Sequence, residues 1–126
     1  MEQSAVTLIY PAYVFWPSAI AFHEIEDAED IEYCFEFNDI QDENLVGWDS
    51  EGKRFTLAWD KKRSCGFPVP EKTDLAGLEE KVTLFNQHRS DDHTFFAKEE
   101  IVDGECSPRV INRFLKQVQE RLGPKS

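Results

Sequence analysis

Short apolar runs separated by polar turns occupy the first part of the chain. Residues 5–10 (AVTLIY) form one such run, which ends at Pro11 and is typical of a strand buried on both faces. Residues 13–16 are expected to continue this strand beyond a kink. The pattern therefore predicts a central strand near the amino terminus.

A hairpin is predicted from residues 20–25 and 31–37, with an acidic tip at residues 26–30. Its second arm alternates, since Ile31, Tyr33, Phe35 and Phe37 recur at every second position. Period two is the spacing of a half-buried strand. A helix over residues 18–30 is the alternative for the first arm, because Pro17 suits a helix start.

A second hairpin is predicted from residues 45–49 and 54–60. Gly52 lies in its turn, where a positive φ is needed, and Phe55, Leu57 and Trp59 share one face. Residues 61–70 are predicted to be a loop, because Pro68 and Pro70 interrupt regular structure.

Two helices are predicted after this loop. The first covers about residues 74–88, with Thr73 or Asp74 as N-cap and a core-facing stripe of Leu75, Leu78, Val82 and Phe85. The second covers about residues 107–122. Ser107 and Pro108 start it, Gly123-Pro124 end it, and Val110, Ile111, Phe114, Leu115, Val118 and Leu122 form its buried face. Residues 94–98 (TFFAK) are expected to add a short strand.

These elements predict a single α+β domain over residues 1–126. An antiparallel sheet of about five or six strands, drawn from the N-terminal two-thirds, packs against the two helices. A length of 126 residues fits one domain, and 40% hydrophobic with 13% aromatic residues can supply a core. The chain is therefore expected to fold despite its net charge of −11.

Charge is distributed very unevenly along the chain. Residues 1–52 contain thirteen carboxylates and neither Lys nor Arg, whereas the remaining residues carry all 14 basic side chains against 12 acidic ones. Such asymmetry costs stability through self-repulsion but can steer a positively charged partner. The alternative, that these carboxylates serve only solubility, stays open.

The cysteine pattern indicates a reducing compartment. Cys34, Cys65 and Cys106 are odd in number and widely spaced, unlike a disulfide framework. The uncharged stretch over residues 3–22 lacks the basic start of a signal peptide, and two prolines would break a spanning helix. We expect a cytoplasmic protein that does not enter the membrane.

No catalytic or cofactor motif is present. His88 and His93 flank Asp91 and Asp92 without the spacing of a metal site, and residues 39–43 lack the mid-loop glycine of an EF-hand. Cys65 follows a basic cluster but has no histidine placed by sequence to activate it. The pI near 4.6 disfavours nucleic-acid binding. No metal, cofactor or nucleic acid is therefore expected.

The charge pattern favours a non-enzymatic module that binds a basic protein. Small acidic inhibitors of basic toxins, especially nucleases, have this size and charge, and aromatic anchors within an acidic rim suit such binding. Trp16 and Trp48 lie in the acidic half. The predicted contact set is Glu26, Asp27, Glu29, Asp30, Asp39, Asp42, Glu43 and Trp48.

Two other classes remain open. An acidic secretion chaperone or regulatory adaptor would share the size and charge but would more often dimerise through an apolar groove. A small enzyme would need a pocket where His23, His88 or His93 meets a carboxylate or thiol, which sequence alone does not reveal.

Overall fold

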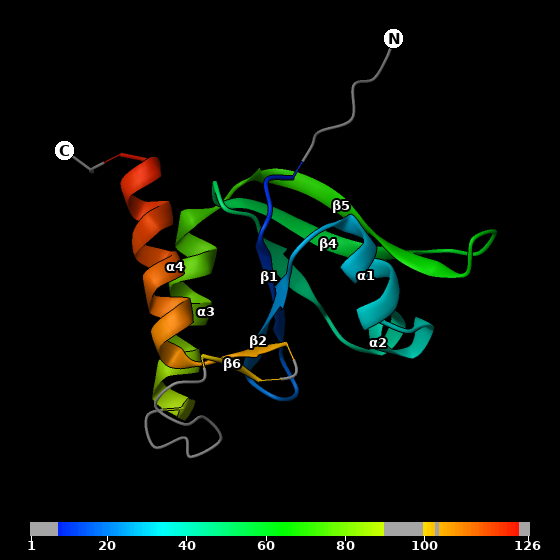
Figure 1. The fold of residues 1–126 in the computed structure, drawn as a ribbon, viewed down its shortest axis with the longest axis horizontal. Helices are drawn as coiled ribbons and strands as arrows, with labels where there is room; N and C mark the ends of the chain where they lie inside the picture. The colour runs from blue at the N-terminus through cyan, green and yellow to red at the C-terminus, as the bar shows by residue number, and fades with distance from the viewer. Residues whose placement is uncertain (1–7, 90–99, 103, 124–126) are drawn as a thin grey trace, which may run out of the picture.

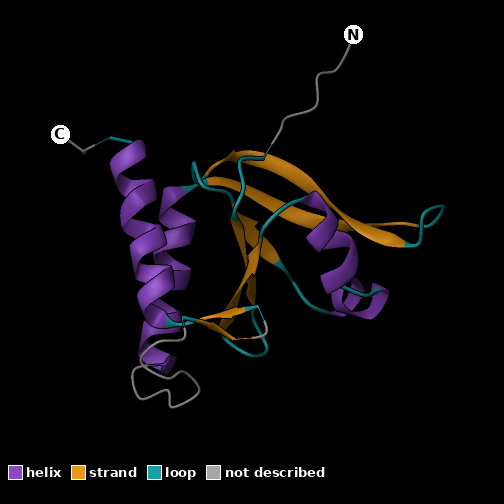
Figure 2. Cartoon of the chain, viewed as in Figure 1, coloured by secondary structure: helices purple, strands orange, loops and turns teal. Residues whose placement is uncertain are grey.

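An antiparallel sheet with helices on both faces forms the core of the computed structural model, which describes residues 8–89, 100–102 and 104–123 (Figures 1 and 2). The α+β prediction is confirmed. The seven strands are ordered β5-β4-β3-β1-β2-β7-β6. The elements are β1 (Ala12–Trp16), β2 (Ala21–Ile25), α1 (Ala28–Cys34), α2 (Phe37–Asp42), β3 (Val46–Trp48), β4 (Lys53–Asp60), β5 (Cys65–Thr73), α3 (Leu75–Arg89), β6 (Ile101–Val102), β7 (Glu105–Cys106) and α4 (Pro108–Arg121).

Strand β1 is the centre of the sheet, which explains its continuous apolar sequence. It pairs with β2 on one side and β3 on the other. Tyr13 and Phe15 pack toward α3 and α4, whereas Ala12 and Val14 belong to a second apolar cluster on the opposite face. A strand covered on both faces needs apolar residues at every position rather than at alternate ones.

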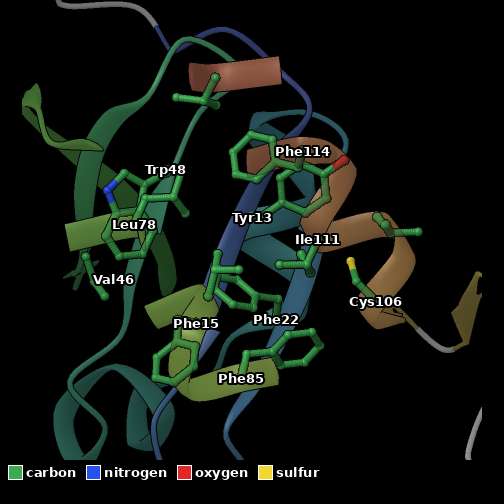
Figure 3. Close-up of a cluster of buried hydrophobic side chains, with 13 residues drawn as sticks. Tyr13, Phe15, Phe22, Val46, Trp48, Leu78, Phe85, Cys106, Ile111 and Phe114 are labelled. Carbon is green, nitrogen blue, oxygen red and sulfur yellow. The ribbon is translucent and has the colours of Figure 1, made fainter. Parts of the chain in front are cut away.

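The larger apolar cluster joins the sheet to α3 and α4 (Figure 3). The predicted helices are both confirmed. The backbone N–H of Gly77 donates to the Asp74 carboxylate, and the backbone N–H of Val110 donates to the Ser107 hydroxyl. Asp74 and Ser107 therefore act as the N-caps of α3 and α4. Leu122 is an exception to the predicted buried stripe of α4, since it is 41% exposed at the helix end.

The second cluster lies beneath α1 and α2 on the other face of the sheet. Ile31 and Phe35 point into it and are buried, whereas Tyr33 is exposed. These two buried residues are four positions apart, which is the spacing of one helical face. The predicted strand over residues 31–37 is therefore wrong. The alternative helix over residues 18–30 is also wrong, because the strand β2 occupies the middle of this segment.

The hairpin of β3 and β4 is confirmed, and Gly52 has a φ of +85° in its turn. Within β3, Gly47 has a packing role, because a Cβ there would lie 2.4 Å from the ring of Phe55. Phe55 is fully buried in the second cluster. The glycine thus leaves the space that this ring occupies.

The loop predicted over residues 61–70 is wrong from Cys65 onward, where β5 begins. This strand lies at the edge of the sheet and pairs only with β4. Pro68 and Pro70 are tolerated because an edge strand needs backbone donors on one side only. The sheet also extends beyond the predicted region of the chain, since β6 and β7 add to its other edge.

Two predicted strands are only partly tested. Residues 8–10 of the first predicted run are described and are not a strand, while residues 5–7 lie outside the described residues. The predicted strand at residues 94–98 also lies outside them. No helix in the described part of the chain is long and apolar enough to cross a membrane.

Candidate acidic binding surface

Residues 26–43, which comprise α1, α2 and their flanks, form what we call the acidic surface. They lie on the face of the sheet opposite α3 and α4 (Figure 1). This segment contains nine carboxylates and no Lys, Arg or His. They are Glu26, Asp27, Glu29, Asp30, Glu32, Glu36, Asp39, Asp42 and Glu43. The two predicted acidic loops therefore belong to one helical segment, where the first lies at the start of α1 and the second at the end of α2.

Three of these carboxylates have a structural task. Asp27 caps α1 by accepting a hydrogen bond from the backbone N–H of Asp30, and the Asp30 carboxylate accepts one from the N–H of Glu26. Asp39 accepts from the N–H of Glu36 at the start of α2. Negative charge in the first turn also favours each helix through its dipole. Their presence alone is thus no sign of binding.

The acidic surface keeps most of its charge. Its one ion pair with a described basic residue joins Glu32 to Arg63 at 2.6 Å. Other arginines pair with carboxylates elsewhere: Arg54 contacts Glu71 and Asp74, and Arg113 contacts Glu100. Internal pairing within the described residues therefore neutralises little of the negative charge on α1 and α2.

Two aromatic side chains project from the acidic surface. Tyr33 on α1 is 80% exposed, and Phe37 at the start of α2 is 46% exposed. The Phe37 ring meets that of Trp59 edge to face, with centroids 5.6 Å apart. Sequence reasoning missed both as surface residues because it placed them on the buried side of a strand. The cap spacing between Asp27 and Asp30 was the signal that could have revealed a helix.

The tryptophans do not have the predicted role. Trp48 is 1% exposed, and its indole N–H donates to the carbonyl of Asp74, so it belongs to the core and leaves the predicted contact set. Trp16 is half-buried and stacks on Phe35 with centroids 5.5 Å apart. Of the seven predicted carboxylates, four are exposed and three are half-buried: Glu26, Asp27, Glu29 and Asp42 are exposed, whereas Asp30, Asp39 and Glu43 are half-buried.

The histidines are dispersed. His23 on β2 is half-buried, and its ring lies 5.7 Å from that of Trp16. Burial lowers the pKa of His23, and the nearby Glu105 carboxylate partly opposes this effect. His88 is exposed on α3, and His93 lies outside the described residues. The two described histidines thus lie on separate elements and do not form one site.

The described cysteines and carboxylates form neither a disulfide nor a metal-binding group. All three cysteines are described and form no disulfide. Cys65 is buried in β5, while Cys34 is exposed on α1. Partial desolvation of the Cys34 thiol, and after it the negative charge of Asp30, raise the pKa of this cysteine. A raised pKa disfavours the reactive thiolate. Within the described residues, no group of three metal-ligating side chains comes together; Asp91 and Asp92 lie outside them.

A polar group interrupts the apolar packing where β1, β2 and β7 meet. The Tyr13 hydroxyl donates to the Glu24 carboxylate at 3.2 Å, and Cys106 is fully buried nearby. Burial raises the pKa of Tyr13, Glu24 and Cys106, and the mutual proximity of these groups adds to it for the tyrosine and the thiol. These groups are therefore held neutral more readily than they are in water, as a structural polar cluster requires.

No protein-family model matches this chain, and neither the search of curated proteins nor the search of solved structures found a match.

Proposed function

We propose that this chain is a non-enzymatic module that binds a basic protein through the acidic surface, in the manner of an immunity protein that inhibits a nuclease toxin. The observation that carries the proposal is the helical segment over residues 26–43, which has nine carboxylates and no basic residue, and in which only Glu32 pairs with a described cation. Unneutralised charge of one sign accelerates encounter with a partner of the opposite sign.

The exposed aromatic residues supply the second requirement of such an interface. Charge alone contributes more to association rate and specificity than to affinity, whereas desolvated aromatic anchors dominate binding energy. Tyr33 and Phe37 lie among the carboxylates of α1 and α2 and are the anchors we assign. They replace Trp48 in the contact set.

Inhibition would follow from occlusion. A nuclease presents basic side chains that hold the phosphates of its substrate. Carboxylates on α1 and α2 would occupy those positions and exclude the nucleic acid. Such a partner would be neutralised in the cytoplasm of a bacterial producer, which agrees with three unpaired thiols in the chain.

A matched pair of double variants tests the proposal. Glu29→Lys/Asp42→Lys reverses two exposed carboxylates of the acidic surface, and Glu80→Lys/Glu120→Lys reverses two exposed ones on α3 and α4. Both change the net charge equally, so a general charge effect acts on both. When the variants are used as baits in host lysate, only Glu29→Lys/Asp42→Lys is expected to lose a basic partner that the wild-type chain captures. Equal loss from both baits would contradict a role for this surface.

An adaptor or chaperone is the second candidate. Phe67 and Val69 on β5 are both exposed, on the same side of the strand. An edge strand with exposed apolar side chains offers unpaired backbone groups and apolar area to a second chain. Two results would favour an adaptor or chaperone. The chain would form a concentration-dependent dimer that Phe67→Ser/Val69→Ser disrupts, and the Lys variants above would have no effect on partner binding.

A further inference from the structure

A cavity of about 560 Å³ lies between α3, β4 and the connection from α2 to β3, and it borders the end of the acidic surface at Ile40 and Glu43. This volume falls within the range of small-molecule sites. Phe15, Leu45 and Val46 supply apolar lining, and Asn44 and Thr56 supply neutral hydrogen-bonding groups. The lining thus combines these three apolar side chains, each no more than 6% exposed, with several polar groups.

Two cations line the cavity, and one of them, Lys81, has no ion pair within the described residues. Arg54 is engaged with Asp74 and Glu71 at 3.1 and 3.3 Å. The Lys81 ammonium instead lies 5.6 Å from the centroid of the Phe15 ring, and no described carboxylate forms an ion pair with it. Exposed lysines need no such partner, but Lys81 is half-buried. Its charge is therefore available to an anion inside the cavity.

We propose that this cavity binds a small organic monocarboxylate. The carboxylate would pair with Lys81, and the apolar body would pack on Phe15, Leu45 and Val46. A second anionic group on the ligand would lack a counter-charge, because Arg54 is already paired with Glu71 and Asp74 and the other charged side chain in the lining, Glu43, is negative. We therefore expect the site to prefer a ligand with one negative charge over a ligand with two, and its test uses the isolated chain without the proposed partner.

Phenylacetate is a suitable probe, because it joins one carboxylate to a flat apolar body. Titration into the ¹⁵N-labelled full chain is expected to give saturable shifts at Phe15, Val46 and Thr56, with a Kd of about 1–10 mM for a ligand of this size. Phenylacetamide and succinate, which lack the single charge, are expected to bind at least about fivefold more weakly.

Variants of Lys81 test the ion pair. Lys81→Gln is expected to weaken phenylacetate binding about tenfold, the loss of one charge-assisted hydrogen bond, whereas Lys81→Arg should retain it. Lys116→Gln on α4 removes an exposed lysine and should change nothing. Because Lys81→Arg keeps the charge, it separates lost binding from lost folding. Absence of saturable shifts, equal binding of phenylacetamide, or unchanged binding by a folded Lys81→Gln would each overturn the proposal.

Discussion

Replacing Asp49 with alanine is expected to be among the most damaging single changes to this chain. Asp49 is 0% exposed, and its carboxylate accepts three backbone hydrogen bonds of 2.9 Å, from Ile9, Glu51 and Lys53. It thereby ties the segment before β1 to the turn between β3 and β4. Its negative charge belongs to the acidic half of the sequence but serves the fold.

The magnitude follows from these contacts. A net hydrogen bond to a charged group contributes roughly 1.5–3 kcal/mol. Ile9 and Glu51 lie near solvent, so hydration of their N–H groups recovers part of the free energy of the lost hydrogen bonds. The expected loss of unfolding free energy for Asp49→Ala is therefore about 3–5 kcal/mol. Asp49→Asn keeps the shape but presents N–H groups to one of the donors, so it should lose about 2–3 kcal/mol.

Urea unfolding followed by tryptophan fluorescence measures this loss. With an m-value of about 1.5 kcal/mol/M, a loss of 3 kcal/mol lowers the midpoint by about 2 M. Asp42→Ala is the matched control, because that carboxylate is exposed and makes no hydrogen bond to the described residues; it should stay within about 0.5 kcal/mol of wild type. A loss below about 1 kcal/mol for Asp49→Ala would refute the reasoning.

Three further predictions concern packing and protonation. Gly47→Ala should lower the unfolding free energy by about 1–3 kcal/mol, because the added methyl group clashes with the Phe55 ring. A double-mutant cycle with Phe55→Leu should show a smaller loss in the leucine background, and additive losses would contradict this contact. Burial raises the pKa of Glu24, so the stability that Glu24 contributes is present below its unfolded pKa of about 4.5 and is lost as the pH rises through the folded pKa. The variant Glu24→Gln should therefore raise Tm at pH 7 but not at pH 4, and an equal change of Tm at both pH values would contradict this. Burial lowers the pKa of His23, so the stability that His23 contributes is present above about pH 6.5 and is lost as the pH falls through the folded pKa. The variant His23→Gln should therefore lose less unfolding free energy between pH 7 and pH 5 than the wild type, and an equal loss would contradict this.

The sequence predicts elements best where local signals and packing agree. The helix at Pro108–Arg121 has an N-cap, a proline at its first position and apolar residues at helical spacing. The strand at Ala12–Trp16 is apolar throughout because it is central. In both segments, the buried surface and the local preference point to the same structure.

The segment over residues 28–42 shows why the rest could not be predicted. Ile31, Tyr33, Phe35 and Phe37 fit a strand period by coincidence, and only the buried pair Ile31 and Phe35 reports the true helical face. Sequence alone does not tell which aromatic residue of such a set is buried. The error carried over to the candidate site, because it hid Tyr33 and left Trp48 as the apparent anchor.

Strand β5 was missed for a different reason. Prolines disfavour a strand only where both of its edges must donate hydrogen bonds, and Pro68 and Pro70 lie at the edge of the sheet. Strand order is set by tertiary pairing, which local sequence does not encode. The carboxylates that cap helices, such as Asp27, likewise became distinguishable from free ones only in the folded chain.

The most direct test of the central proposal is the association rate of the captured basic partner, measured against ionic strength for three chains. These are wild type, Glu29→Lys/Asp42→Lys and Glu80→Lys/Glu120→Lys. Electrostatic steering by the acidic surface predicts that the first double variant associates about tenfold more slowly at low salt and with a shallower salt dependence, while the second stays near wild type. Equal rates for all three chains, or equal slowing by both double variants, would contradict the account.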